Sequence, residues 1–146
     1  MVFVVLMTMT IFETAGAGAV DDKVIGSVKT LKGEGVIVRE GVTIVPEPGT
    51  RLYQTDVVRT GKDGAMGIIL RDETALAIGP SSELSLKEFV FRPKEGMFAS
   101  VVRFVRGTLV YITGQIARLS PDSVKVETPV GFAAVRGTKF LIKIGE

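Results

Sequence analysis

Short apolar runs, separated by Gly, Asp, Pro and Ser, recur along the chain from residue 24 onward. In the stretch 56–86 these runs cover residues 57–60, 65–70 and 74–78, and only a few residues separate one from the next. Joints this short suit tight turns and leave no room for crossover helices. The pattern therefore predicts a β-meander over residues 56–86, with hairpin turns at its joints.

Similar runs predict strands in the rest of the chain, at residues 24–32, 36–39, 42–45, 51–59 (with a bend at 54–56), 85–91, 100–106, 108–113, 123–128, 132–136 and 138–144. The last run places Phe140 and Ile142 on one face and Lys139 and Lys143 on the other, which is typical of a strand with one buried face. We expect an all-β fold of about 12 short, mainly antiparallel strands in a sandwich, barrel or short β-roll.

Two segments leave an alternative open. Ser85 and Glu88 fit a helix capping box, but Phe89 to Phe91 are strand formers and Pro93 follows too soon for a useful helix, so a strand is preferred. The polar segment 92–96 is the most linker-like part of the chain and marks a possible subdivision.

The N-terminal residues 1–12 are apolar except for Thr8 and Thr10, and the sequence Ala17-Gly18-Ala19 follows. This order is typical of a secretory leader with an A-x-A cleavage site, and the apolar run is shorter than the ~20 residues that span a bilayer. We expect a signal-peptide-like leader at 1–19 and an exported domain at 20–146. No Lys or Arg precedes the run, so a buried strand is the alternative. Because cysteine is absent, a lipid anchor at that site is excluded.

Charge and composition exclude several classes of function. The chain has 18 Lys and Arg against 16 Asp and Glu, and nowhere do four basic residues stand in a row. Phosphate backbones are bound by clustered cations, so no nucleic-acid partner is expected. His and Cys are both absent, which removes the common transition-metal sites, Ser–His–Asp triads and Cys nucleophiles.

The remaining candidates for chemistry also favour structural roles. Gly61-Lys62 is followed by Asp63 where a phosphate-binding loop has Ser or Thr, so it predicts a hairpin turn. Asp72 and Glu73 are adjacent, and adjacent strand residues point to opposite faces, so they too predict a turn and not a catalytic pair.

Two arginines remain open to either interpretation. Arg106 and Arg136 stand in two similar segments, 104–109 and 134–140, that read apolar, Val, Arg, Gly, Thr. Each guanidinium could bind an anion bidentately or tie a bent strand to nearby carbonyls, and the Gly that follows predicts a bend or bulge. We therefore expect no enzyme, no cofactor and no metal site. A binding module whose sheet edges receive a partner is the remaining interpretation.

Several sequence blocks, taken in order from residue 23 to 144, resemble the FecR domain family. The most specific are D-x-V-R-T-G-x-x-G at 56–64 and T-P-x-x-x-x-x-V-R-G-T at 128–138, with Gly79-Pro80-Ser81-Ser82 between them. The family often has Asp-Gly where this chain has Asp72-Glu73, Asn at Ser81 and an acidic residue at Lys139. The motif residues, expected to be structural or to contact a partner, are Asp56, Arg59, Thr60, Gly61, Gly64, Gly79, Pro80, Thr128, Pro129, Arg136, Gly137 and Thr138.

The resemblance implies a periplasmic domain that responds to an outer-membrane receptor and regulates a cytoplasmic anti-sigma segment. No stable membrane span is expected here, so the chain resembles a free-standing FecR domain. The expected function is a non-enzymatic, exported protein-interaction module in envelope sensing or signal-transduction regulation, with another envelope protein as partner. The alternative is a structural module or one that binds an envelope polymer such as a glycan. Aromatic platforms would be expected for a glycan, but the chain has no Trp and only Tyr53 and Tyr111 as tyrosines.

Overall fold

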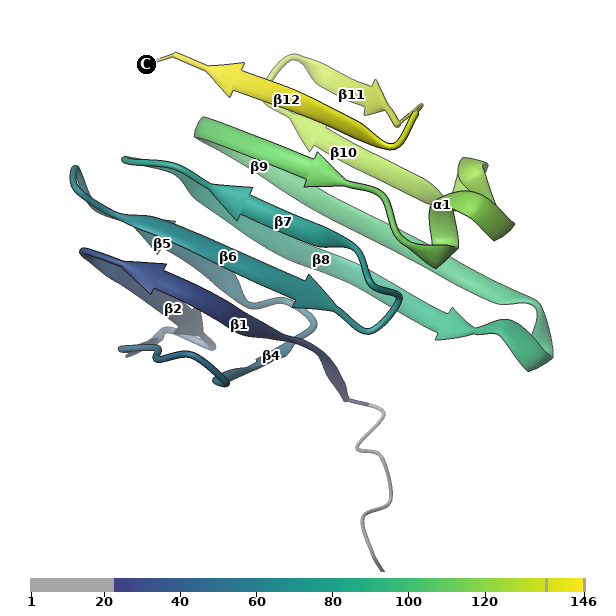
Figure 1. Cartoon of the computed structure of the whole chain (residues 1–146), viewed down its shortest axis with the longest axis horizontal. Helices are drawn as coiled ribbons and strands as arrows, with labels where there is room; N and C mark the ends of the chain where they lie inside the picture. Colours follow the sequence, from purple (N-terminus) through teal and green to yellow (C-terminus); the bar gives the residue numbers. More distant parts are fainter. Residues whose placement is uncertain (1–22, 136, 146) are drawn as a thin grey trace, which may run out of the picture.

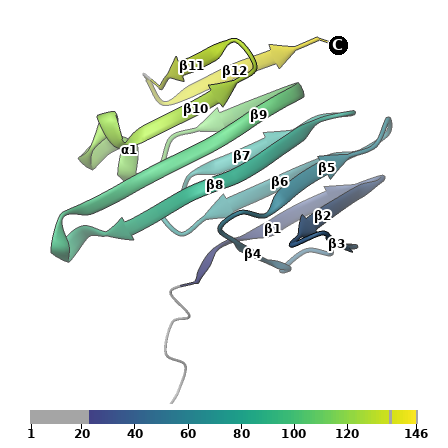
Figure 2. The same cartoon turned by 180° about the vertical axis from the view of Figure 1, so that it is seen from behind.

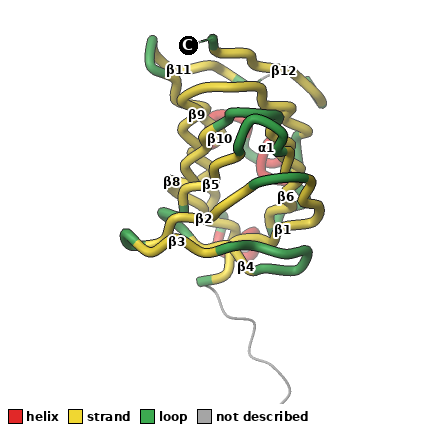
Figure 3. The backbone as a smooth tube through the Cα atoms, turned by 90° about the vertical axis from the view of Figure 1, so that its left-hand side faces the viewer, coloured by secondary structure: helices red, strands yellow, loops and turns green. Residues whose placement is uncertain are grey.

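Twelve β-strands, found within residues 23–135 and 137–145 that the computed structural model describes, form one curled sheet folded into two layers (Figure 1). The front sheet contains β4 (Arg51–Tyr53), β1 (Val24–Lys32), β6 (Ala65–Leu70), β7 (Ala75–Ile78), the C-terminal part of β9 (Met97–Ile112) and β12 (Lys139–Ile144). The back sheet contains β3 (Val42–Ile44), β2 (Gly35–Arg39), β5 (Val57–Thr60), β8 (Glu83–Arg92), the N-terminal part of β9, β10 (Val124–Thr128) and β11 (Gly131–Ala134). Figure 3 shows the two layers side by side, with β8 and β3 in one and β6 and β1 in the other. The all-β prediction is confirmed.

The longest strand, β9, belongs to both layers. Its first part pairs with β8 and β10 in the back sheet, and its last part pairs with β7 and β12 in the front sheet. The change of layer occurs at Gly107, whose φ is +99°. The bend expected at this glycine is therefore confirmed, although the two strands predicted on either side of it form one continuous strand of 16 residues.

The predicted meander over residues 56–86 is wrong. β5 pairs with β2 and β8 in the back sheet, whereas β6 pairs with β1 and β7 in the front sheet. The glycine-rich joint at 61–64 is thus a corner between layers and not a hairpin turn, and the joint at 79–82 is another corner. Of the three predicted strands, only β6 and β7 form a hairpin. A short glycine-rich joint permits either arrangement, and local sequence does not reveal which strand becomes the neighbour.

The predicted strand at 51–59 is likewise divided. β4 lies in the front sheet and β5 in the back sheet, with the change at Gln54 to Asp56 where a bend was expected. The segment 85–91 lies within β8 and is a strand, as preferred over a helix. Residues 92–96 contain a short 3-10 helix, Pro93–Glu95, that joins β8 to β9.

One helix and one parallel strand pair were not predicted. After β9 ends in the front sheet, α1 (Gln115–Leu119) and a 3-10 helix (Pro121–Ser123) lead the chain to the back sheet, where β10 runs parallel to the start of β9 (Figure 2). With five residues, α1 is too short to give a helical period in the sequence.

The core lies between the two layers and receives alternate side chains from each strand. Tyr111 of β9 is buried there and stacks on Phe140 of β12, with ring centroids 4.9 Å apart and planes 13° apart. Burial raises the pKa of the Tyr111 phenol above its ordinary value. The largest fully buried side chains come from both sheets and include Phe104, Ile37, Leu52, Met66, Ile68, Leu76, Leu84, Leu86 and Leu109.

We predict that Gly107→Ala lowers the free energy of unfolding by about 3 kcal/mol, because it combines a positive φ with overpacking. An added Cβ would lie 2.0 Å from Ser82 Oγ and 2.6 Å from Ser82 Cα. Gly96→Ala is the matched control, since Gly96 has a φ of +65° but nothing within 4 Å of its Cβ position. The control should lose only about 1 kcal/mol. Equilibrium urea unfolding of both variants measures the difference, and equal losses would show that close packing at the bend is unimportant.

Candidate functional site

One end of the molecule consists of corners at which the chain passes between the two sheets. The four corners are residues 33–34, residues 61–64, residues 79–82 and Gly107. Backbone hydrogen bonds join neighbouring corners: the Gly61 N–H donates to the Glu34 carbonyl over 3.0 Å, and the Ser81 N–H donates to the Gly61 carbonyl over 2.9 Å. We call this set of stacked corners the corner column. It satisfies polar backbone groups that would otherwise be buried without partners.

Two hydroxyl side chains hold the corner column together. Thr60 Oγ1 donates to the Gly79 carbonyl over 2.6 Å and accepts from the Ser82 N–H over 2.9 Å. Ser82 Oγ in turn accepts from the Thr108 N–H over 3.0 Å and donates to the Pro80 carbonyl over 3.2 Å. The structure thus brings together five of the motif residues predicted from the sequence, which are Thr60, Gly61, Gly64, Gly79 and Pro80. Ser82, which completes this network, was not among the predicted site residues.

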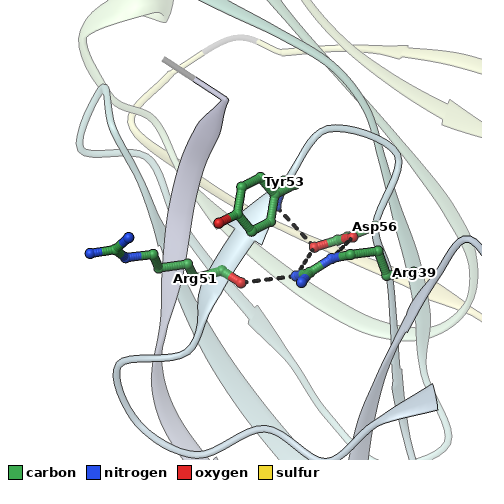
Figure 4. Close-up of polar contacts among 4 residues, drawn as sticks. All are labelled: Arg39, Arg51, Tyr53 and Asp56. Carbon is green, nitrogen blue, oxygen red and sulfur yellow. Dashed lines mark hydrogen bonds and ion pairs between the residues drawn. The ribbon is translucent and has the colours of Figure 1, made fainter. Parts of the chain in front are cut away.

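At the opposite end of the strands, the passage from β4 to β5 is fixed by Asp56, which is fully buried (Figure 4). Its carboxylate accepts from both Nε and Nη2 of Arg39, over 2.9 and 2.8 Å, and from the Tyr53 N–H over 2.9 Å. Arg39 also donates to the Arg51 carbonyl over 3.1 Å and lies over the Tyr53 ring, 4.5 Å from its centroid. The bidentate hydrogen bond to Asp56 raises the pKa of the Arg39 guanidinium.

Arg39 was not predicted as a site residue. It lies in β2, 17 positions from Asp56, which stands between β4 and β5, and no local motif links the two. An unusually buried aspartate can be suspected from a motif, but its partner depends on which strands become neighbours. The arrangement is a structural lock, because Asp56 has no exposed surface with which to contact a ligand.

A second buried aspartate, Asp72, fixes the return from the front sheet through α1. Its carboxylate accepts from the Thr74 N–H, from Thr74 Oγ1 and from the Ile116 N–H at distances between 2.8 and 3.2 Å. Its backbone carbonyl accepts from the Gln115 N–H over 2.7 Å. The prediction that Asp72-Glu73 form a turn is confirmed, and Glu73 adopts a φ of +71° there. The sequence did not reveal that Asp72 also orients the helix.

Charged side chains on the outer face of the back sheet largely pair with one another. Arg59 of β5 donates to Glu83 of β8. Lys87 Nζ of β8 lies 3.2 Å from Glu127 Oε2 of β10. The motif residue Arg59 is therefore engaged on the surface and does not point into a pocket. Exposed pairs of this kind contribute little stability, typically below about 1 kcal/mol.

The remaining motif residues lie toward β11 and β12. Thr128 Oγ1 donates to the Gly131 carbonyl over 2.8 Å in the turn that contains Pro129, and the Gly137 and Thr138 carbonyls accept from Thr113 Oγ1 over 3.2 and 3.3 Å. Arg136 lies outside the described residues. The Arg106 side chain is exposed and its guanidinium makes no hydrogen bond or ion pair with the other described residues, so a tie to backbone carbonyls, one of the two interpretations, is not found there.

Exposed apolar side chains gather around these last strands. Val130 is 97% exposed, Phe132 is 71% exposed and Leu141 is 63% exposed. A hollow of about 510 Å³ lies beside β10 and β11, where Val124, Lys125 and Phe132 are among its lining residues. Apolar groups exposed next to open strands are typical of an interaction surface. Among the described residues no group of three or more acidic side chains is placed to hold a metal ion.

The comparison with known families supplies the identification. Residues 56–146 match the family described as FecR protein. The chain belongs to the FecR family. The family match begins at Asp56. The resemblance noted in the sequence blocks begins earlier, at residue 23. No curated protein and no solved structure matches the chain.

The FecR match contains the buried Asp56, most of the corner column and the strands β5 to β12, whereas β1 to β4 precede it. Membership of the FecR family indicates that the chain is involved in the regulation of envelope signalling. Proteins of this family are usually periplasmic or membrane-associated and interact with other proteins. In the part of this FecR-family chain that is described, no helix is both long and apolar enough to cross a membrane.

We predict that Asp56→Asn lowers the free energy of unfolding by about 2 to 3 kcal/mol, because it leaves Arg39 with an uncompensated charge beside a buried amide. The side chain of Arg39 is 31% exposed, which keeps the loss below that of a fully buried pair. Glu83→Gln is the control, since it removes an exposed ion pair and should cost less than about 1 kcal/mol. Thermal and urea unfolding measure both. If the two variants lose equal stability, the lock has no special role in this FecR-family fold.

Proposed function

We propose that this FecR-family chain is a non-enzymatic, exported protein-interaction module that takes part in envelope sensing or signal-transduction regulation. The observation that carries the proposal is the family match over residues 56–146, because this region includes the last strands and their exposed apolar side chains. The partner is another envelope protein. The compartment is the periplasm, which is supported by the family and by the leader-like residues 1–19.

The distribution of polar groups also supports a binding role. The two buried aspartates and the hydroxyls of the corner column are all engaged in hydrogen bonds that hold the fold. A general acid or base needs a titratable group within reach of a substrate, and neither carboxylate is exposed. What the surface offers is strand edge and apolar side chain, and these are groups that recognise protein segments.

Export is tested first, with the whole chain fused at its C-terminus to a reporter enzyme that is active only outside the cytoplasm. We expect activity from the native sequence and none from Val5→Lys/Leu6→Lys, which interrupts the apolar run that a leader needs. Val45→Lys, an exposed position in the folded domain, should leave the activity unchanged. A native chain that stays in the cytosol would contradict the proposal.

The partner is tested in intact cells by chemical cross-linking of the affinity-tagged chain, followed by purification from the envelope fraction. We expect a discrete protein adduct of reproducible mass. Sedimentation of the purified chain with cell-wall material, without a protein adduct, would instead support the glycan-binding alternative. An exported chain that gives neither result would show that it is not an interaction module.

A further inference from the structure

Within the described residues, β12 lies at an edge of the front sheet (Figures 1 and 3). Among the residues that the structure describes, it pairs with β9 alone. The Thr113 N–H donates to the Thr138 carbonyl over 2.9 Å, so the backbone N–H and C=O groups of Thr138 point towards β9. Hydrogen bonding alternates along an antiparallel strand, and the N–H and C=O groups of Lys139, Leu141 and Lys143 therefore point away from β9. These are the groups that an added strand would bind.

The side chains of β12 are also incompletely covered. Phe140, Ile142 and Ile144 face the core but are only half-buried, although they pack against its buried residues. On the outer face, Leu141 is exposed between Lys139 and Lys143. A strand added beside β12 would complete the burial of Phe140, Ile142 and Ile144. On the outer face, its side chains would lie directly against those of Lys139, Leu141 and Lys143.

β12 differs from the other edge strands in length. β3 and β4 have three residues each and β11 has four, whereas β12 has six. Short edges offer few backbone groups, which is one way in which proteins avoid unwanted pairing. β12 is thus the longest of these four strands at the ends of the sheets.

The charges of β12 are not matched within the molecule. The β9 residues opposite Lys139, Leu141 and Lys143 are Ile112, Val110 and Thr108, none of which is acidic. Neither lysine forms an ion pair with another described residue, in contrast to Lys87 and Arg59 on the back sheet. An occupant of this edge that carries carboxylates would be complementary to both lysines.

A second copy of the chain does not provide this complement. Residues 139–144 contain no Asp or Glu, and antiparallel pairing of two β12 strands about Leu141 would set Lys139 opposite Lys143. Like charges directly opposite each other destabilise a strand pair. Strands β3, β4 and β11 carry no carboxylate within the described residues, and residues 87–92 of β8, which have no strand on the β5 side, carry only Glu88.

We propose that β12 receives, as an additional strand, an extended segment of the partner protein with two acidic residues four positions apart and apolar residues between them. The acids pair with Lys139 and Lys143, the central apolar residue lies beside Leu141, and the flanking two cover Phe140 and Ile142. The pattern is symmetric, so it fits in either strand direction. This inference rests on the proposed function, and it names the surface and the chemistry of the partner.

Two short peptides test the preference. One has the core Glu-Val-Val-Val-Glu and the other Lys-Val-Val-Val-Lys, each flanked by Gly and Ser for solubility. With the glutamate peptide at millimolar concentration, we expect NMR shifts and slower hydrogen exchange at the amides of Lys139, Leu141 and Lys143. The lysine peptide should bind about tenfold more weakly or worse, because its charges repel the edge. No response at β12, or equal responses to both peptides, would overturn the proposal.

Charge reversal provides the matched test. Lys139→Glu/Lys143→Glu should invert the preference between the two peptides, whereas Lys29→Glu/Lys32→Glu, on exposed positions of β1, should leave it unchanged. Inversion in both variants, or in neither, would show that the charges of β12 do not select the segment.

The same variants separate this inference from the proposed function. If the native chain and Lys139→Glu/Lys143→Glu cross-link equally well to an envelope protein, the β12 proposal fails and the proposed function stands. If neither chain gives an adduct, the proposed function itself fails. Loss of the adduct in this variant, with retention in Lys29→Glu/Lys32→Glu, is the result we expect.

Discussion

The passage of the chain between two packed sheets is the constraint on which this structure depends. Each crossing takes backbone N–H and C=O groups out of a strand ladder at the edge of the core, where they still need partners. At one end the crossings partner one another in the corner column, through backbone groups and the hydroxyls of Thr60 and Ser82. At the other end two buried carboxylates, Asp56 and Asp72, accept the hydrogen bonds of the crossing segments. The side chains that satisfy these backbone groups are therefore hydroxyls at one end and carboxylates at the other.

The backbone segments approach one another closely at both ends. At the corner column the backbones are in contact, and a Cβ on Gly64 would lie 2.1 Å from the Glu34 carbonyl. Only glycine permits that approach, and Gly107 adds a positive φ that lets β9 leave one sheet and enter the other without a break. At the opposite end a Cβ on Gly114 would lie 2.4 Å from the Asp72 carbonyl oxygen, and aspartate side chains add hydrogen bonds to this close backbone contact. An aspartate can accept several N–H groups at once, and Arg39 balances the charge of Asp56.

The sequence predicted the local elements well because their signals are local. Alternation located β12 and β10, and the glycine after Arg106 located the bend in β9. The pairing of β5 with β8, and not with β6, is decided by which corners stack, and that is a property of several distant segments together. For the same reason Asp56 and Thr60 could be selected from a motif, whereas Arg39 and the role of Asp72 could not. The parallel pairing of β10 depends on α1, whose five residues carry no periodic signal.

Half of the twelve motif residues hold the crossings between the two sheets. Asp56 is buried in its lock, and Thr60, Gly61, Gly64, Gly79 and Pro80 are committed to the corner column. Residues that hold the backbone in this way specify the fold, and they would be required whatever the partner is. Recognition therefore has to come from positions that the crossings leave free. On β12 these are Lys139, Leu141 and Lys143, whose side chains are exposed and make no contribution to either end of the fold. A shared motif with different partners is then the expected outcome, because the fold and the edge chemistry reside in separate sets of residues.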